Sequence, residues 1–220
     1  MTAEPRPTTL GSGGLSALTD AELGSPAQRD RRKRILDATL ALASKGGFEA
    51  VQMRAVAERA DVALGTLYRY FPSKIHLLVS GLIREFGRAL ERLERAPIPG
   101  NTPAERVLYV LGRNTRSLQR EPRLTEAMTR AFMFADTSVA SEVVEVGRLT
   151  ERMLTKAMGV DEPSDEDKAI ARVVGDVWLS NLVAWVTRRA SAEDVTTRLE
   201  LTVRLLLGHR AARPGEGQAE

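Results

Sequence analysis

The stretch Val51–Lys74, VQMRAVAERADVALGTLYRYFPSK, decides the fold of the first part of this 220-residue chain. Small apolar residues recur at helical spacing up to Ala60, and Asp61 interrupts that pattern. Pro72 ends the next helical run, because the residue before a proline is pushed out of the α region. The stretch therefore predicts two short helices joined by a tight turn, which is a helix-turn-helix.

The second helix of this motif is predicted to point Leu67 and Phe71 inward and to leave polar and aromatic groups outside. Hydroxyl, guanidinium and phenol groups can hydrogen-bond to phosphate oxygens and to base edges in the major groove of DNA. An alternative interpretation makes the two tyrosines core residues of a plain helical hairpin. The residues expected on or near the exposed side are Thr66, Tyr68, Arg69 and Tyr70.

The run FEAVQMRAVAERADVALGTLYRYFPSKIHLL, with its LYRYF-x-x-K ending, resembles the DNA-binding domain of TetR-family transcriptional repressors. Over most of the chain the resemblance is closer to those family members that repress cholesterol catabolism. The family implies that the start of the first motif helix and the exposed face of the second contact DNA. Leu64 replaces a frequently polar residue, so it is expected to contact a thymine methyl rather than to hydrogen-bond a base. The implied DNA-binding residues are Gln52, Met53, Arg54, Leu64, Gly65, Thr66, Tyr68, Arg69, Tyr70 and Lys74.

Charge is concentrated in the same part of the chain. The whole chain carries a formal charge of +3, whereas residues 28–75 contain ten Lys/Arg and five Asp/Glu, a net +5. The basic run from Arg29 to Arg34 begins the preceding helix. It is either a solvated helix start or a set of phosphate or minor-groove contacts beside the motif. A basic segment beside a balanced one is typical of a DNA-binding module with a partner domain.

Composition excludes several other classes of protein. The chain has no cysteine and two histidines far apart in sequence, His76 and His209, which argues against disulfides, thiol nucleophiles and zinc fingers. A glycine-rich phosphate loop of recognised spacing is missing as well. We therefore expect no enzyme, no metal site and no cofactor. The chain shows neither a continuous apolar run of about 18 residues nor a secretory signal, so we expect no membrane association and a cytoplasmic protein.

The chain is predicted to be all-α. Residues 1–27 are interpreted as a disordered tail, 28–75 as the DNA-binding domain, 76–210 as an effector-binding and dimerisation domain, and 211–220 as a second tail. A long helix over Lys74–Arg95 joins the two domains, and Gly46-Gly47 ends the helix before the motif. The stretch Ala96–Thr102 is the clearest internal linker. The remaining predicted helices are Pro103–Arg120, Pro122–Ala135, Ser138–Met158, Asp165–Ala190 and Ser191–His209.

The last two predicted helices are apolar over too wide an arc for a single contact face. One face of each can pack on the domain core while the other meets a second subunit. This pattern predicts a homodimer built as a four-helix bundle, with Val203 and Leu206 at the interface. A large monomeric core is the alternative.

Methionine and aromatic residues are spread through the second half of the chain, where they either line an adaptable apolar cavity or form plain core. In a TetR-like protein this half is the effector domain, which favours the cavity. The polar Asn181 could orient a ligand carbonyl or be satisfied within the core. The predicted cavity residues are Met128, Phe132, Met133, Met153, Trp178, Asn181, Leu182 and Trp185.

A stripe of arginines follows the predicted helix Pro103–Arg120. Arg113, Arg116 and Arg120 lie at i, i+3 and i+7, and Arg123 continues the series past Pro122. Because arginine suits phosphate geometry, Arg113 and Arg116 are predicted to hold the phosphates of a ligand. A solvated helix face explains the stripe equally well.

Together these features predict a ligand-responsive dimeric repressor that binds a palindromic DNA operator. The resemblance implies that the effector is a cholesterol-derived coenzyme A thioester that releases the repressor from genes of sterol catabolism. The first alternative is a TetR-like repressor that senses another hydrophobic ligand, such as a fatty acyl-CoA or a drug. An enzyme and a passive helical interaction protein are the remaining alternatives.

Overall fold

The computed structural model describes Ala17 and residues 24–210 of the chain, and the tail predictions for 1–16, 18–23 and 211–220 lie outside them. The described residues form nine α-helices and one short 3-10 helix, with no strand among them, so the all-α prediction is confirmed. The helices are α1 Pro26–Ala50, α2 Met53–Ala60, α3 Leu64–Tyr70, α4 Lys74–Glu94, α5 Pro103–Arg120, α6 Pro122–Met133, α7 Ala140–Met158, α8 Asp165–Val186 and α9 Ala192–Leu207, with the 3-10 helix η2 at Thr137–Val139.

The helix-turn-helix is present and its boundaries have local causes. Helix α1 starts inside the predicted tail, because the side chains of Ser25 and Gln28 form a capping box there. It kinks at Gly47, whose φ of 67° is a conformation that glycine adopts without steric cost. Asp61 closes α2 with a φ of 53°, and this left-handed residue makes the tight turn before α3.

One prediction for α3 was wrong. Tyr70 is 2% exposed and belongs to the core of the N-terminal half, while Tyr68 is 48% exposed. The reason is helical geometry: Tyr70 lies three residues after the buried Leu67 and therefore shares its face. Leu67 and Phe71 are both fully buried, as expected.

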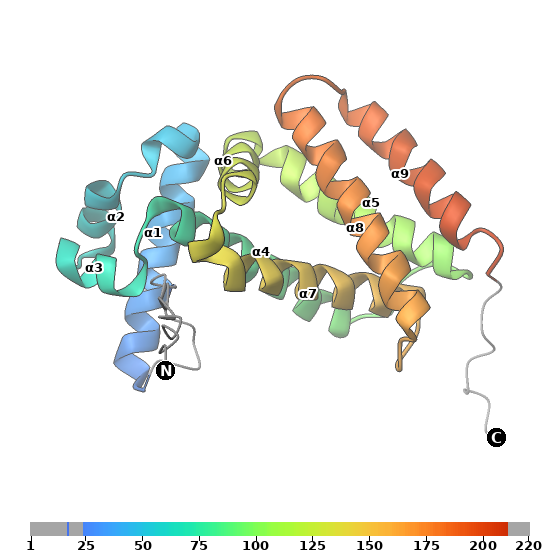
Figure 1. The fold of residues 1–220 in the computed structure, drawn as a ribbon, viewed down its shortest axis with the longest axis horizontal. Coiled ribbons are helices and arrows are strands. Elements are labelled where there is room, and N and C mark those ends of the chain that lie inside the picture. Colours follow the sequence, from blue (N-terminus) through green and yellow to red (C-terminus); the bar gives the residue numbers. More distant parts are fainter. Residues whose placement is uncertain (1–16, 18–23, 211–220) are drawn as a thin grey trace, which may run out of the picture.

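Helix α4 runs from the N-terminal three-helix group into the second half of the molecule, side by side with α7 (Figure 1). Its N-terminus is capped by Ser73, whose hydroxyl accepts the backbone N–H of His76. Helix α6 packs against α1 and also against α4 and α8. Through α6, buried residues of the second half such as Ala127 and Met128 join the core around α1 to α4. The two halves therefore share a packed junction rather than meeting only through α4.

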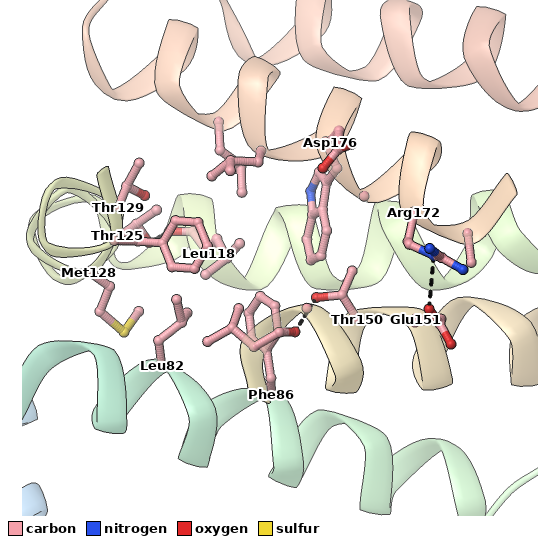
Figure 2. Close-up of a pocket in the computed structure, with 18 residues that line it drawn as sticks. Leu82, Phe86, Leu118, Thr125, Met128, Thr129, Thr150, Glu151, Arg172 and Asp176 are labelled. Carbon is pink, nitrogen blue, oxygen red and sulfur yellow. Dashed lines mark hydrogen bonds and ion pairs between the residues drawn. The ribbon is translucent and has the colours of Figure 1, made fainter. Parts of the chain in front are cut away.

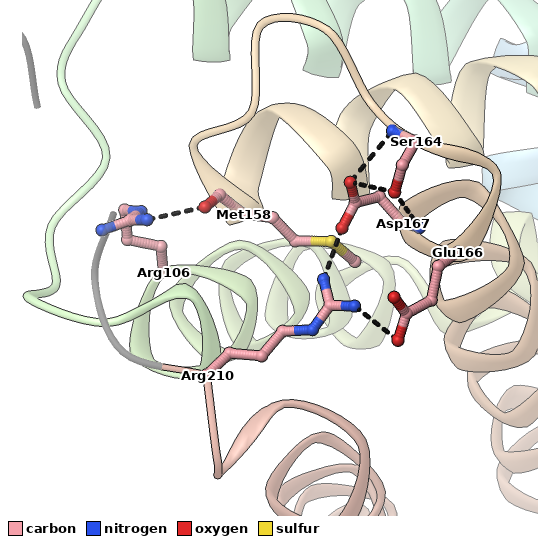
Figure 3. Close-up of polar contacts among 6 residues, drawn as sticks. All are labelled: Arg106, Met158, Ser164, Glu166, Asp167 and Arg210. Carbon is pink, nitrogen blue, oxygen red and sulfur yellow. Dashed lines mark hydrogen bonds and ion pairs between the residues drawn. The ribbon is translucent and has the colours of Figure 1, made fainter. Parts of the chain in front are cut away.

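The end of α9 is fastened to the start of α8 by charged groups (Figure 3). Arg210 pairs with Asp167 and, at 2.8 Å, with Glu166. Asp167 also accepts the hydroxyl of Ser164 at 2.6 Å, in the capping box that begins α8. Nearby, Arg106 donates to the carbonyl oxygen of Met158 at 2.6 Å and so satisfies the end of α7.

The outer faces of α8 and α9 carry exposed apolar side chains. Val173 is 48%, Leu201 55% and Leu205 71% exposed. By length and composition alone α8 could cross a membrane, but its buried positions, among them Trp178, pack inside the protein. Val203, which we expected at a subunit interface, is 0% exposed and belongs to the core of its own subunit.

Candidate nucleic-acid interface and ligand cavity

The predicted DNA-binding residues gather at one end of the molecule, on the starts of α2 and α3 and the outer face of α3. Five of them are exposed, as a base or phosphate contact requires. Four others, Met53, Leu64, Thr66 and Lys74, are half-buried, and Tyr70 is buried in the N-terminal core. The exposed five are Gln52, Arg54, Gly65, Tyr68 and Arg69.

Lys74 lies in a more enclosed environment than its predicted role suggests. Its Nζ is 4.0 Å from the ring centroid of Phe48 and donates to the Phe48 carbonyl oxygen at 3.4 Å. The same nitrogen is 3.9 Å from Glu49. Arg130 of α6 lies over the same ring at 4.3 Å and pairs with Glu49 at 3.0 Å. Lys74 therefore helps to join α4, α6 and the end of α1.

Part of the basic run on α1 also has an internal role. The guanidinium of Arg32 lies 5.5 Å from the ring centroid of Phe71. Arg34 donates to the carbonyl oxygen of Ala60 at 3.1 Å and so ties α1 to α2. Lys33 is exposed beside them. The internal contacts of Arg32 and Arg34 belong to neither interpretation of the run, and its phosphate or minor-groove role stays a prediction.

A cavity of about 130 Å³ lies between helices α4 to α8 (Figure 2). Its wall is mostly apolar and combines residues up to 100 positions apart. Polar groups are confined to threonines on α6 and α7 and to three charged residues, Glu151, Arg172 and Asp176. The apolar lining includes Leu82, Phe86, Leu118, Met128, Phe132, Val146, Trp178, Leu179 and Leu182.

A second cavity of about 90 Å³ adjoins the first on the side of α5. Phe86 and Trp178 line both cavities and stack on each other with ring centroids 5.7 Å apart. Trp178 is held in place because its Nε1 donates to the buried hydroxyl of Thr115 at 2.9 Å. Phe86, on α4, is only half-buried. The stacked pair thus forms part of the wall between the two cavities, which Leu82, Leu118, Thr125 and Met128 share as well.

Comparison with known proteins identifies the family. The bacterial regulatory proteins of the tetR family match residues 35–80, and the tetracyclin repressor-like C-terminal domain matches residues 100–206. The HTH-type transcriptional repressor KstR of Rhodococcus jostii is 64% identical over 199 residues, covering 90% of this chain and 93% of that protein. KstR of Mycolicibacterium smegmatis is 63% identical over 194 residues, covering 88% of this chain and 95% of that protein. The chain belongs to the TetR family.

Solved structures agree with this assignment. A TetR transcriptional regulator from Rhodococcus sp. RHA1 is 32% identical, with a TM-score of 0.78 over 84% of this chain and 100% of that one. FadR of Thermus thermophilus, a TetR-family repressor solved in complex with lauroyl-CoA, shares the fold at 23% identity and a TM-score of 0.64. It covers 86% of this chain and 100% of FadR. This chain is therefore a KstR-like, TetR-family transcriptional repressor with a DNA-binding helix-turn-helix.

Five of the eight residues predicted for an effector cavity line one of the two cavities. Met128, Phe132, Trp178 and Leu182 line the first cavity, and Met153 lines the second.

The other predicted residues lie elsewhere in the fold. Met133 is 56% exposed at the end of α6. Trp185 lines a shallow depression at the turn between α8 and α9. Asn181 is buried, but its Nδ2 donates to the Val177 carbonyl of its own helix at 2.8 Å, so its amide is satisfied there. Periodicity places all three residues on helices, but it does not say which side of each helix borders a void.

The arginine stripe does not line either cavity. Arg113 is half-buried and Arg116 is exposed, and Arg116 borders a small depression between α5 and α9. Arg123 donates to the Lys45 carbonyl oxygen of α1. The stripe is therefore divided between the two halves of the TetR fold, and its proposed phosphate role rests on Arg113 and Arg116 alone.

Sequence reasoning missed the α4 and α7 walls of the cavity and the threonines of α6. Gly147 and Gly175 could have pointed to the cavity from the sequence alone. Glycine in a helix interior costs about 1 kcal/mol of stability relative to alanine, so its presence there indicates a packing or functional reason. Both line the cavity, and a Cβ at Gly147 would meet no atom within 4 Å. A Cβ at Gly175 would lie 3.1 Å from Thr150. Glycines at the crossing of α7 and α8 leave room that larger residues would fill.

Proposed function

We propose that this TetR-family repressor acts as a homodimer on a near-palindromic operator and is released by a cholesterol-derived coenzyme A thioester. The observation that carries the proposal is identity of 61–64% to KstR repressors through both the helix-turn-helix and the effector half. Each subunit presents α3 to one half-site, with half-site centres about 34–36 Å apart or a multiple of that distance. These relatives and the DNA-binding fold favour a regulator over an enzyme.

The cavity supports a large apolar effector. The two spaces of about 130 and 90 Å³ become one if Phe86 moves away from Trp178. Trp178 is anchored by Thr115, so the displacement falls on Phe86 and on α4. Helix α4 begins directly after the helix-turn-helix, and its movement changes the orientation of α3 relative to the partner subunit. The effector acts by its higher affinity for the displaced state.

A fatty acyl-CoA is the second candidate, since the structurally similar FadR was solved with lauroyl-CoA. A flexible acyl chain could thread through narrow connected spaces without separating the stacked rings. The two candidates therefore differ in how far they must displace α4.

A gel-shift titration tests the proposal. The operator is first selected from random DNA by the protein itself and is then titrated with a steroid-acid coenzyme A thioester, lauroyl-CoA and free coenzyme A. We expect release at the lowest concentration with the steroid thioester and no release with coenzyme A. Release by lauroyl-CoA alone would replace the proposal with its alternative.

A further inference from the structure

The two ends of the first cavity differ in the side chains that line them (Figure 2) and in their exposure to solvent. At the α6 end Thr125, Met128 and Thr129 are 2%, 3% and 8% exposed. At the opposite end the side chain of Arg172 is 62% exposed and pairs with Glu151 at 3.2 Å. The α6 end is thus closed and uncharged, and the end between α7 and α8 is open and charged.

The hydroxyl of Thr129 is unusual at the closed end. It forms no hydrogen bond within the part of the chain that the structure describes, and it faces the cavity (Figure 2). Its neighbour Thr125 is satisfied, because it donates to the Leu118 carbonyl oxygen at 2.6 Å. Five other helical threonines donate to the carbonyl four residues earlier, namely Thr39, Thr150, Thr155, Thr196 and Thr202, as does Thr187 at the end of α8.

The side chain of Thr129 is 8% exposed, and its hydroxyl borders the cavity, where a ligand oxygen can reach it. Valine would fill the same space at position 129 but could not hydrogen-bond a ligand. A threonine whose hydroxyl makes no hydrogen bond to its own helix and faces a cavity is placed to contact a ligand.

We propose that Thr129 hydrogen-bonds a single oxygen at the buried end of the effector and thereby selects ligands that carry it. The inference rests on the proposed function, since it deepens the specificity of the same cavity. The ligand class is a rigid apolar body with a carbonyl or hydroxyl oxygen at one end and an anionic group at the other. Because burying an unpaired charge is far costlier than burying a carbonyl, the anionic end must lie at the solvent-exposed mouth and not at the closed end.

A sterol thioester meets these requirements. The ring oxygen of a sterol lies at one end of the molecule, and the thioester is formed at the other end, on the side chain. A saturated fatty acyl chain has no oxygen at its buried end and would leave Thr129 unsatisfied. The hydroxyl therefore provides a basis for discrimination that an apolar wall alone cannot give.

The test uses two coenzyme A thioesters of steroid acids that differ only in the presence of a ring carbonyl at the end remote from the thioester. Calorimetry measures the affinity of both for the full-length parent protein and for Thr129→Val. The control is Thr150→Val, which removes a hydroxyl of the same cavity that already donates to the Val146 carbonyl oxygen. A further variant, Thr129→Ser, retains the hydroxyl but not the methyl group.

We expect the parent to prefer the carbonyl-bearing thioester by about 2- to 10-fold, as the net contribution of one hydrogen bond implies. Thr129→Val should bind the two thioesters equally, while Thr150→Val and Thr129→Ser should keep the preference. Operator binding without ligand verifies that each variant is folded.

Two results would overturn the inference while leaving the proposed function standing. One is equal affinity of the parent for the two thioesters, and the other is an undiminished preference in Thr129→Val. If neither thioester binds the parent, the proposed function fails together with the inference.

Discussion

Arg69 and Lys74 are both basic residues of the DNA-binding segment, but their side chains lie in different surroundings. Arg69 is exposed on α3 and makes no ion pair or hydrogen bond among the described residues. Lys74 is engaged with the ring and carbonyl of Phe48. Of these two basic residues, Arg69 is available to contact DNA, as the proposed function requires, whereas Lys74 helps to join the two halves.

At position 69 the prediction concerns DNA affinity. Arg69→Ala should weaken operator binding and lower the slope of log affinity against log salt by about one, since one phosphate contact is lost. Fluorescence anisotropy at several salt concentrations measures the slope. Thermal stability should stay within about 0.5 kcal/mol of the parent, as for other exposed substitutions.

Lys74→Ala is the comparison for that experiment. It removes a cation–π contact worth about 0.5–1 kcal/mol at a partly exposed site, so the protein should unfold at lower denaturant concentration. The salt slope of Lys74→Ala reports whether the same charge also contacts a phosphate. An unchanged slope in both variants would remove the phosphate role from this segment.

At the scale of elements, Arg210, Asp167 and Glu166 form a charged clasp that joins the end of α9 to the start of α8. This clasp depends on the ionised carboxylate of Asp167. Hydrogen bonding from Ser164, followed by the interaction with Arg210, lowers the pKa of Asp167 to about 2. An aspartate in an unfolded chain titrates near pH 3.9. A lowered pKa means that the folded state binds this proton less readily, so the clasp stabilises the fold above about pH 4 and loses this contribution between pH 4 and pH 2.

Asp167→Asn should therefore lower the free energy of unfolding at pH 7 by on the order of 1–2 kcal/mol. The free energy of unfolding of this variant should also fall less steeply than that of the parent as the pH is lowered. Denaturant unfolding measured from pH 7 down to pH 3 would show both effects. Arg210→Ala should have the smaller effect, because the Ser164 hydrogen bond remains. Parallel pH profiles for the parent and Asp167→Asn would contradict this account of the clasp.

At the scale of the whole molecule, the apolar side chains exposed on α8 and α9 are a feature that the single subunit leaves unexplained. Val173, Leu201 and Leu205 are exposed on helices whose opposite faces are firmly buried. Contiguous exposed apolar surface on a soluble protein marks an interaction site. A second copy of the chain, packed α8 and α9 against α8 and α9, would cover it as the proposed function requires.

Leu201→Asp combined with Leu205→Asp should separate the subunits, because each substitution places an unpaired charge in the proposed interface. Sedimentation velocity should then show a monomer that retains helical content, and operator affinity should fall steeply. A dimer that persists in the double variant would place the interface elsewhere. Val203→Asp is the contrasting control, since it buries a charge in the core of one subunit and should prevent folding.

Much of the architecture is determined locally and could therefore be predicted. Prolines and capping side chains such as Ser25, Ser73 and Thr102 set the starts of helices through contacts within one turn. The same is true of the turn at Asp61. The apolar spacing of α3 also predicts that Tyr70 is buried, since Tyr70 lies three residues after the buried Leu67.

The cavity could not be predicted in this way, because it is the space left where five helices fail to fill the interior. Helical periodicity shows that Phe86 and Met153 face inward, but not whether each meets a neighbour or a void. The role of Thr129 likewise depends on the hydrogen bond that its hydroxyl lacks. Hydrogen-bond satisfaction and empty volume are properties of side chains brought together from distant parts of the chain, so only the tertiary structure decides them.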